Sequence, residues 1–396
     1  MTKYNLSKEY LMAIIAGQAV RGENFWDRPY LMEDITDIIE SGGHILLVAP
    51  RRVGKTSLMY KVLDTMGEEY VIIYINTEAE HSVEAFWEKL FHELMDDEFI
   101  GTLSTKANNL WSKLKSIRLS EAGIKGIKFG DSEPIDYAKA FLDLLKSVDT
   151  DKKLIIMLDE FSQTIENIIQ RESVEEAEQL LKVHREIRQN HKVSEKTVFI
   201  YAGSIGLESV VANINSSKHI NDLASIAVPP FEAEDAKAFA KDLCDKNGIA
   251  IEESDIVYML GKIEWYIPFY IQLLAQEVKR LYRRNPEVNE SVIDRAVENA
   301  LSNRKDFIHW EERLNTFSKK GRVYAKEVLS LISTKKSVES KELSNLAIKH
   351  ETKEAEAKEI IHALKYDGYI NNSGDARIYR FNSALLRIWW YNNVAN

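Results

Sequence analysis

The residues best suited to chemistry form the run Ala-Pro-Arg-Arg-Val-Gly-Lys-Thr at positions 49–56. A short apolar segment precedes this run, and the apolar helix start Ser57-Leu58 follows it. Strand, tight loop and helix in that order predict a phosphate-binding loop, because backbone N–H groups of the loop and the helix start converge on an anion. Lys55 would place its charge on the β- and γ-phosphates, and Thr56 would offer a hydroxyl to Mg²⁺. We therefore predict that nucleotide is bound by Ala49, Pro50, Arg51, Arg52, Val53, Gly54, Lys55, Thr56 and Ser57.

The first position of this loop departs from the usual pattern. Ala49 stands where phosphate-binding loops carry their first glycine. Gly54, the glycine that lets the backbone approach the phosphates, is present, and alanine is still small enough for the turn. We expect the loop to bind nucleotide with this substitution.

Two adjacent carboxylates, Asp159 and Glu160, close an apolar segment at 154–158. If this segment is a strand of a parallel sheet, both carboxylates lie at its carboxyl end, where such sheets bind ligands. We predict that Asp159 holds Mg²⁺, directly or through water, and that Glu160 orients and deprotonates the attacking water. Together with Lys55, these residues predict hydrolysis of a nucleoside triphosphate with Mg²⁺. The helical lid and winged helix predicted after residue 228 favour ATP and ADP as the ligands over guanine nucleotides.

Three other positions each allow two interpretations. Ser204, at the end of a predicted strand, either reports the γ-phosphate beside Mg²⁺ or is a loop serine without a role. Asn76, at the end of another strand, either holds Glu160 in an inactive rotamer or simply caps a turn. Pro268 opens a helix after Tyr266-Ile267 and either packs on the base or ribose or only starts that helix.

Two arginines, Arg185 and Arg188, lie three positions apart and share one helix face. Either could reach across a subunit boundary and stabilise transition-state charge on a neighbour's nucleotide. The alternative is that both belong to a solvated helix face.

The elements that must position these residues alternate between strand and helix, which predicts an α/β fold with a parallel sheet and helices on both faces. A small hairpin at 117–119 and 124–129 is predicted within an insertion at about 100–136. The predicted strands are 45–48, 70–75, 154–158 and 197–204. The predicted helices are 7–19, a helix that follows Leu31 and ends at about 41, 55–66, 82–97, 134–148 and 162–190.

The pattern changes at Pro229-Pro230, beyond which helices are predicted at 232–247, 254–262, 268–283 and 291–310. Residues 321–396 predict three helices and a two-stranded ribbon, 369–370 and 378–381, which is the order of a winged helix-turn-helix. We therefore expect an N-terminal helical lead-in (1–20), a P-loop ATPase core (21–228), a helical lid (229–318) and a winged helix (319–396).

Composition limits the classes of protein that fit. A chain of 396 residues suggests two or three domains, and a net charge of −10 argues against a protein that coats nucleic acid. The single cysteine, Cys244, excludes an intramolecular disulfide and a cysteine-based metal cluster. No run of 18 apolar residues and no signal peptide is found, so we expect a soluble, cytoplasmic protein without a membrane partner.

The winged helix raises the question of DNA binding. Residues 321–396 carry 12 Lys and Arg against 9 Asp and Glu, yet the third helix is rich in acids. Four carboxylates on or beside a helix pressed to phosphates would oppose binding, which favours protein docking or autoinhibition over DNA contact. The Trp389-Trp390-Tyr391 cluster favours packing at a domain junction over base stacking. The four acids are Glu351, Glu354, Glu356 and Glu359.

Taken together, these segments resemble the archaeal-type ATPase family within the STAND branch of AAA+-like P-loop proteins. The resemblance is carried by Phe-Trp-Asp-Arg at 25–28, the loop at 49–58, Leu-Asp-Glu-Phe at 158–161, Ala-Gly-Ser at 202–204, Trp-Tyr-Ile-Pro at 265–268 and the segment 379–390. This sequence departs from the family at Asp27, Ala49 and Tyr266, where glycines are usual.

The resemblance implies an ATP-dependent switch that holds nucleotide between core and lid, with a winged helix that senses or transmits its state. Turnover is then slow or partner-activated, and the partner is an unidentified protein or a second copy of the chain. The alternative is a DNA-binding ATPase regulator or loader resembling origin-recognition ATPases.

Overall fold

The computed structural model describes residues 12–94, 136–203, 206–372 and 374–395. The chain divides into two compact units. The sheet unit comprises the described residues of Arg28–Val48 and Lys61–Ala227, and the lid unit comprises those of Met1–Asp27, Ala49–Tyr60 and Val228–Asn396. The predicted phosphate loop therefore groups with the helices that follow residue 228.

The sheet unit contains five parallel strands in the order β2-β3-β4-β1-β5. In the register of the sheet, Asn76 pairs with Asp159 and Leu158 pairs with Tyr201, so the carboxyl ends of β2, β3 and β4 meet at one edge. The strands are β1 (His44–Val48), β2 (Tyr70–Asn76), β3 (Lys153–Asp159), β4 (Thr197–Tyr201) and β5 (Leu223–Ala227).

The four predicted strands are all present, and the predicted α/β architecture is confirmed. The fifth strand, β5, pairs with β1 at the edge of the sheet and was not predicted. Its sequence, Leu-Ala-Ser-Ile-Ala, buries only Ile226, so it lacks the continuous apolar run of a central parallel strand.

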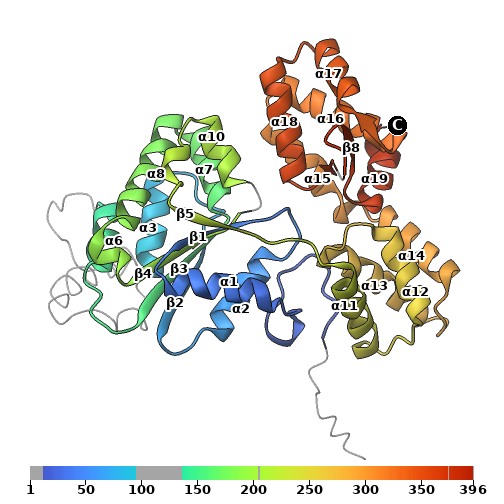
Figure 1. Ribbon diagram of the computed structural model, residues 1–396, viewed down its shortest axis with the longest axis horizontal. Coiled ribbons are helices and arrows are strands. Elements are labelled where there is room, and N and C mark those ends of the chain that lie inside the picture. The colour runs from blue at the N-terminus through green and yellow to red at the C-terminus, as the bar shows by residue number, and fades with distance from the viewer. Residues whose placement is uncertain (1–11, 95–135, 204–205, 373, 396) are drawn as a thin grey trace, which may run out of the picture. The chain divides into compact units, whose positions relative to one another are not determined.

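Helices cover both faces of the sheet (Figure 1). One face carries α1 (Pro29–Glu40), which buries Ile35 and Ile39 completely and starts with Pro29 at its first position. On the other face, apolar side chains of β2, β3 and β4 form one continuous core with the short α9 (His191–Ser194) and five longer helices. The longer helices are α3 (Val83–Glu93), α6 (Tyr137–Leu145), α7 (Phe161–Arg171), α8 (Val174–Arg188) and α10 (Leu207–Asn213).

The predicted helix at 162–190 is wrong in one respect, because two helices occupy this range. The helix is interrupted between α7 and α8, where the Ser173 side chain accepts a hydrogen bond from the backbone N–H of Glu176. Such an N-cap satisfies a free donor of a new helix and favours a break over a continuous helix. The predicted helix at 291–310 is likewise two helices, α14 (Glu290–Ser302) and α15 (Ile308–Arg313).

The predicted helix at 7–19 is wrong over 12–19, the part that the structure describes. The backbone N–H of Ala13 donates to Asn24 Oδ1 (2.6 Å), and that of Ile15 donates to Gln272 Oε1 (2.6 Å). Gly17 adopts φ +87°, which breaks helical geometry. Side-chain acceptors from elsewhere in the chain have therefore replaced the helix's own carbonyls. The predicted hairpin at 117–129 lies outside the described residues.

The lid unit holds the four predicted lid helices, the last of them shortened, and the predicted winged helix. The lid helices are α11 (Ala233–Lys246), α12 (Glu253–Ile263), α13 (Pro268–Tyr282) and α14. The winged helix consists of α16 (Lys319–Lys335), α17 (Ser340–Lys349), α18 (Glu354–Tyr366) and the antiparallel strands β6 (Val338–Glu339), β7 (Ile370–Asn371) and β8 (Ile378–Phe381).

A last helix, α19 (Ala384–Trp390), joins the lid to the winged helix by packing on α12, α14 and α16. Trp389 stacks on Phe307 with ring centroids 5.6 Å apart, and Trp390 lies edge-on to Tyr369. Both tryptophans are completely buried, so they pack at the junction, as predicted, and are closed to base stacking. Tyr391, the third residue of the predicted cluster, is exposed. Among the described residues, no helix is long and apolar enough to cross a membrane.

Candidate functional site

The phosphate loop connects the end of β1 to α2 (Lys55–Thr65). Gly54 adopts φ +106°, a conformation that glycine takes at little cost. A side-chain carbon built at Gly54 would meet no atom within 4 Å, so the backbone is open there. The first helical bond of α2 runs from Leu58 N to Gly54 O (2.9 Å), and α2 itself therefore offers no carbonyl to the N–H groups of residues 55–57. This geometry fits a bound phosphate group.

Lys55 lies across its own loop. Its ammonium group donates to Ala49 O (2.8 Å) and Pro50 O (3.1 Å), and the residue is buried. Ala49 is also buried, which explains why a small residue is needed at the position of the missing glycine. Lys55 thus carries a desolvated positive charge at the mouth of the loop, where phosphate oxygens would replace the carbonyls.

Other loop side chains have structural contacts. Val53 is buried in the core, and the Ser57 hydroxyl accepts a hydrogen bond from the Val20 N–H (3.0 Å). Any contribution of these two residues to ligand binding would come from their backbone. Thr56 and Arg51 are partly exposed.

Asp159 and Glu160, the two predicted carboxylates, lie in the sheet unit at the carboxyl end of β3. Asp159 is buried, its Oδ2 accepts from the Tyr74 hydroxyl (2.8 Å) and its Oδ1 accepts from the Glu160 N–H (3.0 Å). These two bonds fix the orientation of the carboxylate. Tyr74 was missed by the sequence analysis, because its relation to Asp159 depends on the pairing of β2 with β3.

Glu160 has an unusual backbone. It adopts φ +57° and ψ +27°, the left-handed region, and forms the N-cap of α7. For a residue with a side chain this conformation costs about 1–2 kcal/mol. Such strain concentrates at functional sites, where surrounding structure maintains it. The turn between β3 and α7 therefore places Glu160 at the sheet edge beside Asp159.

Three further residues were predicted to take part in the site: Asn76, Pro268 and Ser204. Asn76 Oδ1 accepts from the Glu78 N–H (2.9 Å), so in this structure it caps its own turn. Pro268 occupies the first turn of α13, as predicted for a helix start. Ser204 lies outside the described residues.

A magnesium ion would find few protein ligands here. Within the ranges that the structure describes, no group of three or more His, Cys, Asp and Glu is placed to hold a metal. Mg²⁺ commonly takes one or two carboxylates together with substrate phosphates and water. Within the sheet unit, Asp159 is one oriented carboxylate of this kind.

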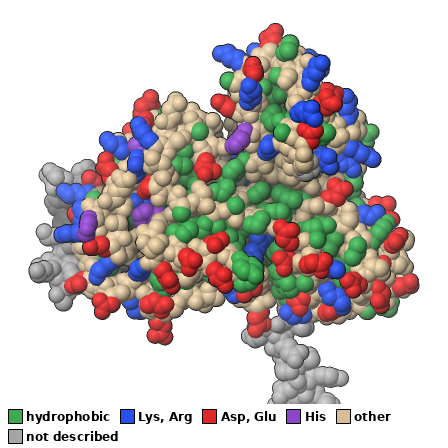
Figure 2. Space-filling view, viewed as in Figure 1, with side chains coloured by type: hydrophobic (Ala, Val, Ile, Leu, Met, Phe, Trp, Pro, Cys, Tyr) green, Lys and Arg blue, Asp and Glu red, His purple; other side chains and the backbone are tan. Residues whose placement is uncertain are grey.

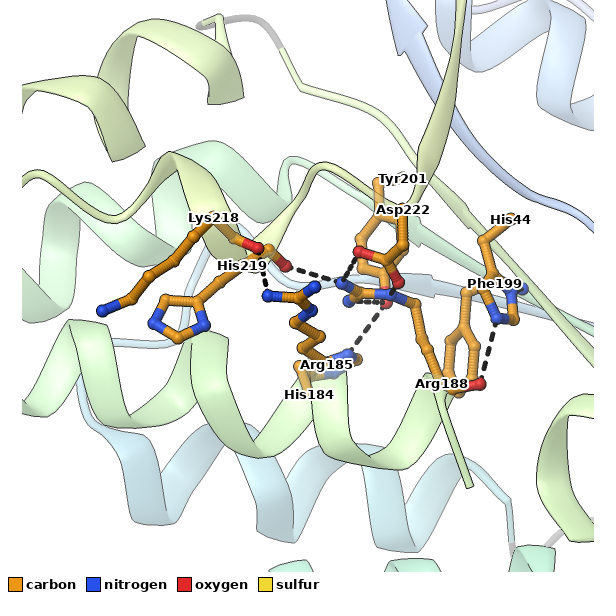
Figure 3. Close-up of polar contacts among 9 residues, drawn as sticks. All are labelled: His44, His184, Arg185, Arg188, Phe199, Tyr201, Lys218, His219 and Asp222. Carbon is orange, nitrogen blue, oxygen red and sulfur yellow. Dashed lines mark hydrogen bonds and ion pairs between the residues drawn. The ribbon is translucent and has the colours of Figure 1, made fainter. Parts of the chain in front are cut away.

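Arg188 is placed differently from both interpretations of the sequence. It is 3% exposed, and its Nε and Nη2 donate to the two oxygens of Asp222 (2.8 Å each). Nη1 donates to the Tyr201 hydroxyl (3.1 Å) and Nη2 to His219 O (2.7 Å), as Figure 3 shows. The expectation of a solvated face or of a trans-acting finger is therefore wrong for Arg188. Arg185 donates to the backbone oxygen of Lys218.

The Arg188 contacts continue into the core. The Tyr201 hydroxyl, which accepts from Arg188, also forms a hydrogen bond with His184 Nδ1 (2.9 Å). Burial raises the pKa of Tyr201 to about 12, although Arg188 opposes the shift. Burial, assisted by the charge of Arg188, holds the pKa of His184 well below its usual value. The His184–Tyr201 hydrogen bond and the Arg188–Asp222 ion pair thus hold α8 and the segment before β5 against the carboxyl end of β4.

In the lid unit, the phosphate loop contacts the lid through Arg52. Nη2 of Arg52 donates to His309 Nδ1 (3.3 Å), so the proton of neutral His309 is on Nε2. Burial, together with the charges of Arg52 and Arg51, lowers the pKa of His309 from 6.5 to about 3. His309 is therefore neutral at physiological pH and accepts this hydrogen bond.

This burial predicts a pH dependence of stability. The unfolded chain protonates His309 below about pH 6.5 and the folded chain only near pH 3, so stability is lost as the pH falls between these values. Relative to a His309→Gln variant, the wild type should lose on the order of 2 kcal/mol between pH 7.5 and pH 5. Urea unfolding of both proteins at the two pH values measures the difference. Equal losses in the two proteins would contradict this assignment.

Comparison with known proteins identifies the family of the chain. A family model described as an ATPase domain predominantly from Archaea matches residues 25–267, which include both the loop and the Asp159-Glu160 pair. No curated protein sequence matches the chain.

Two solved structures share the fold. A Walker-type ATPase of Pyrococcus abyssi is 17% identical, with a TM-score of 0.64 over 95% of this chain and 99% of that chain. The ORC2 protein of Aeropyrum pernix, in ADPNP and ADP complexes, is 11% identical, with a TM-score of 0.53 over 94% of this chain and 96% of that one. Since the family model covers more than half of its length, this chain belongs to the family of ATPase domains found predominantly in Archaea.

Proposed function

We propose that this protein is a molecular switch that binds and hydrolyses ATP, and whose nucleotide state changes the packing of the lid and winged helix and hence partner binding. The observation that carries the proposal is that the phosphate loop packs in one compact unit with the lid and the winged helix. A loop that binds nucleotide cannot change shape without affecting helices packed on it.

Each residue of the proposed site has a separate role in ATP hydrolysis. Loop N–H groups and Lys55 bind and orient the phosphates. Thr56 and Asp159 would hold Mg²⁺, which neutralises phosphate charge when bound. Tyr74 keeps the Asp159 carboxylate in a single orientation. Glu160 orients the attacking water and accepts its proton.

Partner dependence is part of the proposal. Arginine fingers supplied in trans accelerate phosphoryl transfer strongly, and Arg188 is buried in an ion pair within its own unit. Turnover by the isolated chain should accordingly be slow, and a protein partner or a second copy of the chain would raise it.

The alternative function, DNA binding by the winged helix, has weaker support. On α18, Lys358 pairs with Glu354 (2.6 Å), and Glu356 accepts from Ser318 (3.1 Å). Figure 2 shows basic and acidic side chains interspersed over the winged helix on the face in view. Non-specific DNA binding needs unneutralised basic groups on one face. Duplex binding that weakens steeply with salt would favour this alternative.

Loss of the Lys55 charge tests the site itself. We expect Lys55→Ala to weaken ADP and ATP-analogue binding by about 10- to 100-fold, because a charge-assisted contact to phosphate is lost. Titration calorimetry measures the affinities. Lys61→Ala, on the same helix, is the control and should bind as the wild type does. Unchanged affinity in Lys55→Ala would disprove the nucleotide site.

A further inference from the structure

Arg52 is a residue of the phosphate loop whose side chain is held by other parts of the lid unit. Its guanidinium lies 4.4 Å from the centroid of the Phe269 ring, on the first turn of α13. Its Nη2 also donates to His309 Nδ1. A side-chain carbon built on Gly17 would lie 2.8 Å from Arg52 Nη1, so the backbone at Gly17 lies close to the guanidinium.

The backbone of Arg52 is strained in the same place. Arg52 adopts φ +68°, which arginine rarely does. Strain of this kind persists where surrounding contacts maintain it. The contacts of Arg52 with Phe269 and His309 can maintain this strained backbone conformation. The loop conformation and the position of α13 are therefore coupled through one side chain.

We propose that Arg52 is a latch that retains nucleotide by tying the phosphate loop to the lid. The inference deepens the proposed function and rests on it, since it names the contact through which nucleotide and lid affect each other. A nucleotide bound to the loop stabilises the latched arrangement, and by reciprocity the latched lid slows nucleotide release. The interaction of a planar cation with an aromatic face in a partly buried site is strong enough to slow nucleotide release.

A second contact reaches the same loop from the winged helix. A side-chain carbon built on Gly368 would lie 2.8 Å from Pro50 Cβ and 2.5 Å from the Trp265 ring. The neighbouring Asp367 is fixed by Arg313 (3.2 Å), so this turn is firmly held. Gly368→Ala should push the turn away from the loop and loosen the latch without touching Arg52.

The release rate of a fluorescent ADP, measured by stopped flow on the full chain, tests the latch. Arg52→Asn is the informative variant because asparagine tolerates the left-handed backbone and removes the long side chain. We expect release about tenfold faster than in the wild type. Phe269→Leu and Gly368→Ala should accelerate release in the same direction. The double variant Arg52→Asn/Phe269→Leu should release ADP no faster than the faster single variant, because both remove one interaction.

Hydrogen exchange of α13 in the nucleotide-free protein gives an independent readout. Arg52→Asn should raise exchange in the first turns of α13, and Arg51→Asn, which removes the same charge from the adjacent position, should leave it near the wild-type level. Unchanged ADP release and unchanged α13 exchange in Arg52→Asn would overturn the latch. If Lys55→Ala still weakened nucleotide binding in that case, the nucleotide site would stand and only the latch would be disproved.

Discussion

Replacement of Glu160 by glutamine is expected to lower ATP turnover by at least about 100-fold while nucleotide affinity changes little. The carboxylate is needed to accept the proton of the attacking water, whereas the amide can only orient it. Phosphate release under saturating ATP measures turnover, and calorimetry measures affinity. The prediction depends on the left-handed turn that places Glu160 at the edge of the sheet, beside Asp159.

A control and a contrary outcome make this result interpretable. Glu175→Gln, in the exposed first turn of α8, removes the same charge and should retain wild-type turnover. Asp159→Asn should also lose turnover, since it removes the oriented carboxylate proposed to hold Mg²⁺. Wild-type turnover in Glu160→Gln would mean that another group activates the water.

Replacement of Arg188 by methionine should destabilise the protein by about 3–5 kcal/mol, because it leaves the Asp222 carboxylate without its partner. Burial alone would raise the pKa of Asp222, and the two hydrogen bonds and charge of Arg188 outweigh this effect and lower it. Urea unfolding followed by circular dichroism measures the loss. Lys182→Met, on the exposed side of α8, should change stability by less than about 1 kcal/mol.

A compensating variant separates the ion pair from simple packing. Arg188→Met combined with Asp222→Asn removes both charges and should recover part of the lost stability, since the cost lies mainly in the unpaired carboxylate. If the double variant is as unstable as the sum of the single variants, the ion pair is not the source of the effect.

Much of the fold is readable from the sequence because local signals dominate it. Central strands such as β3 are continuous apolar runs, and the order of helices after Pro229 identifies the lid and the winged helix. The failures occur where distant partners decide the outcome. Residues 12–19 are not helical because Asn24 and Gln272 accept their N–H groups, and β5 is a weak edge strand that depends on β1.

The site follows the same division. Lys55 and the Asp159-Glu160 pair are recognisable from spacing, since the chemistry requires them next to a strand end. Tyr74 is 85 positions from Asp159, and Phe269 is far along the chain from Arg52. Arg188 shows most clearly what the sequence cannot predict. Its position on the helix resembles a solvated one, and only the contact with the distant Asp222 shows that it is buried.

The switch itself is tested most directly by hydrogen exchange of the wild-type protein saturated with ADP and, separately, with a non-hydrolysable ATP analogue and Mg²⁺. A nucleotide-dependent switch predicts that amides of α13 and of the winged-helix turn at Gly368 exchange at different rates in the two states, while the central strands β3 and β4 exchange alike. Identical exchange throughout the lid unit, with both nucleotides shown to be bound, would contradict the proposal that nucleotide state controls the lid and the winged helix.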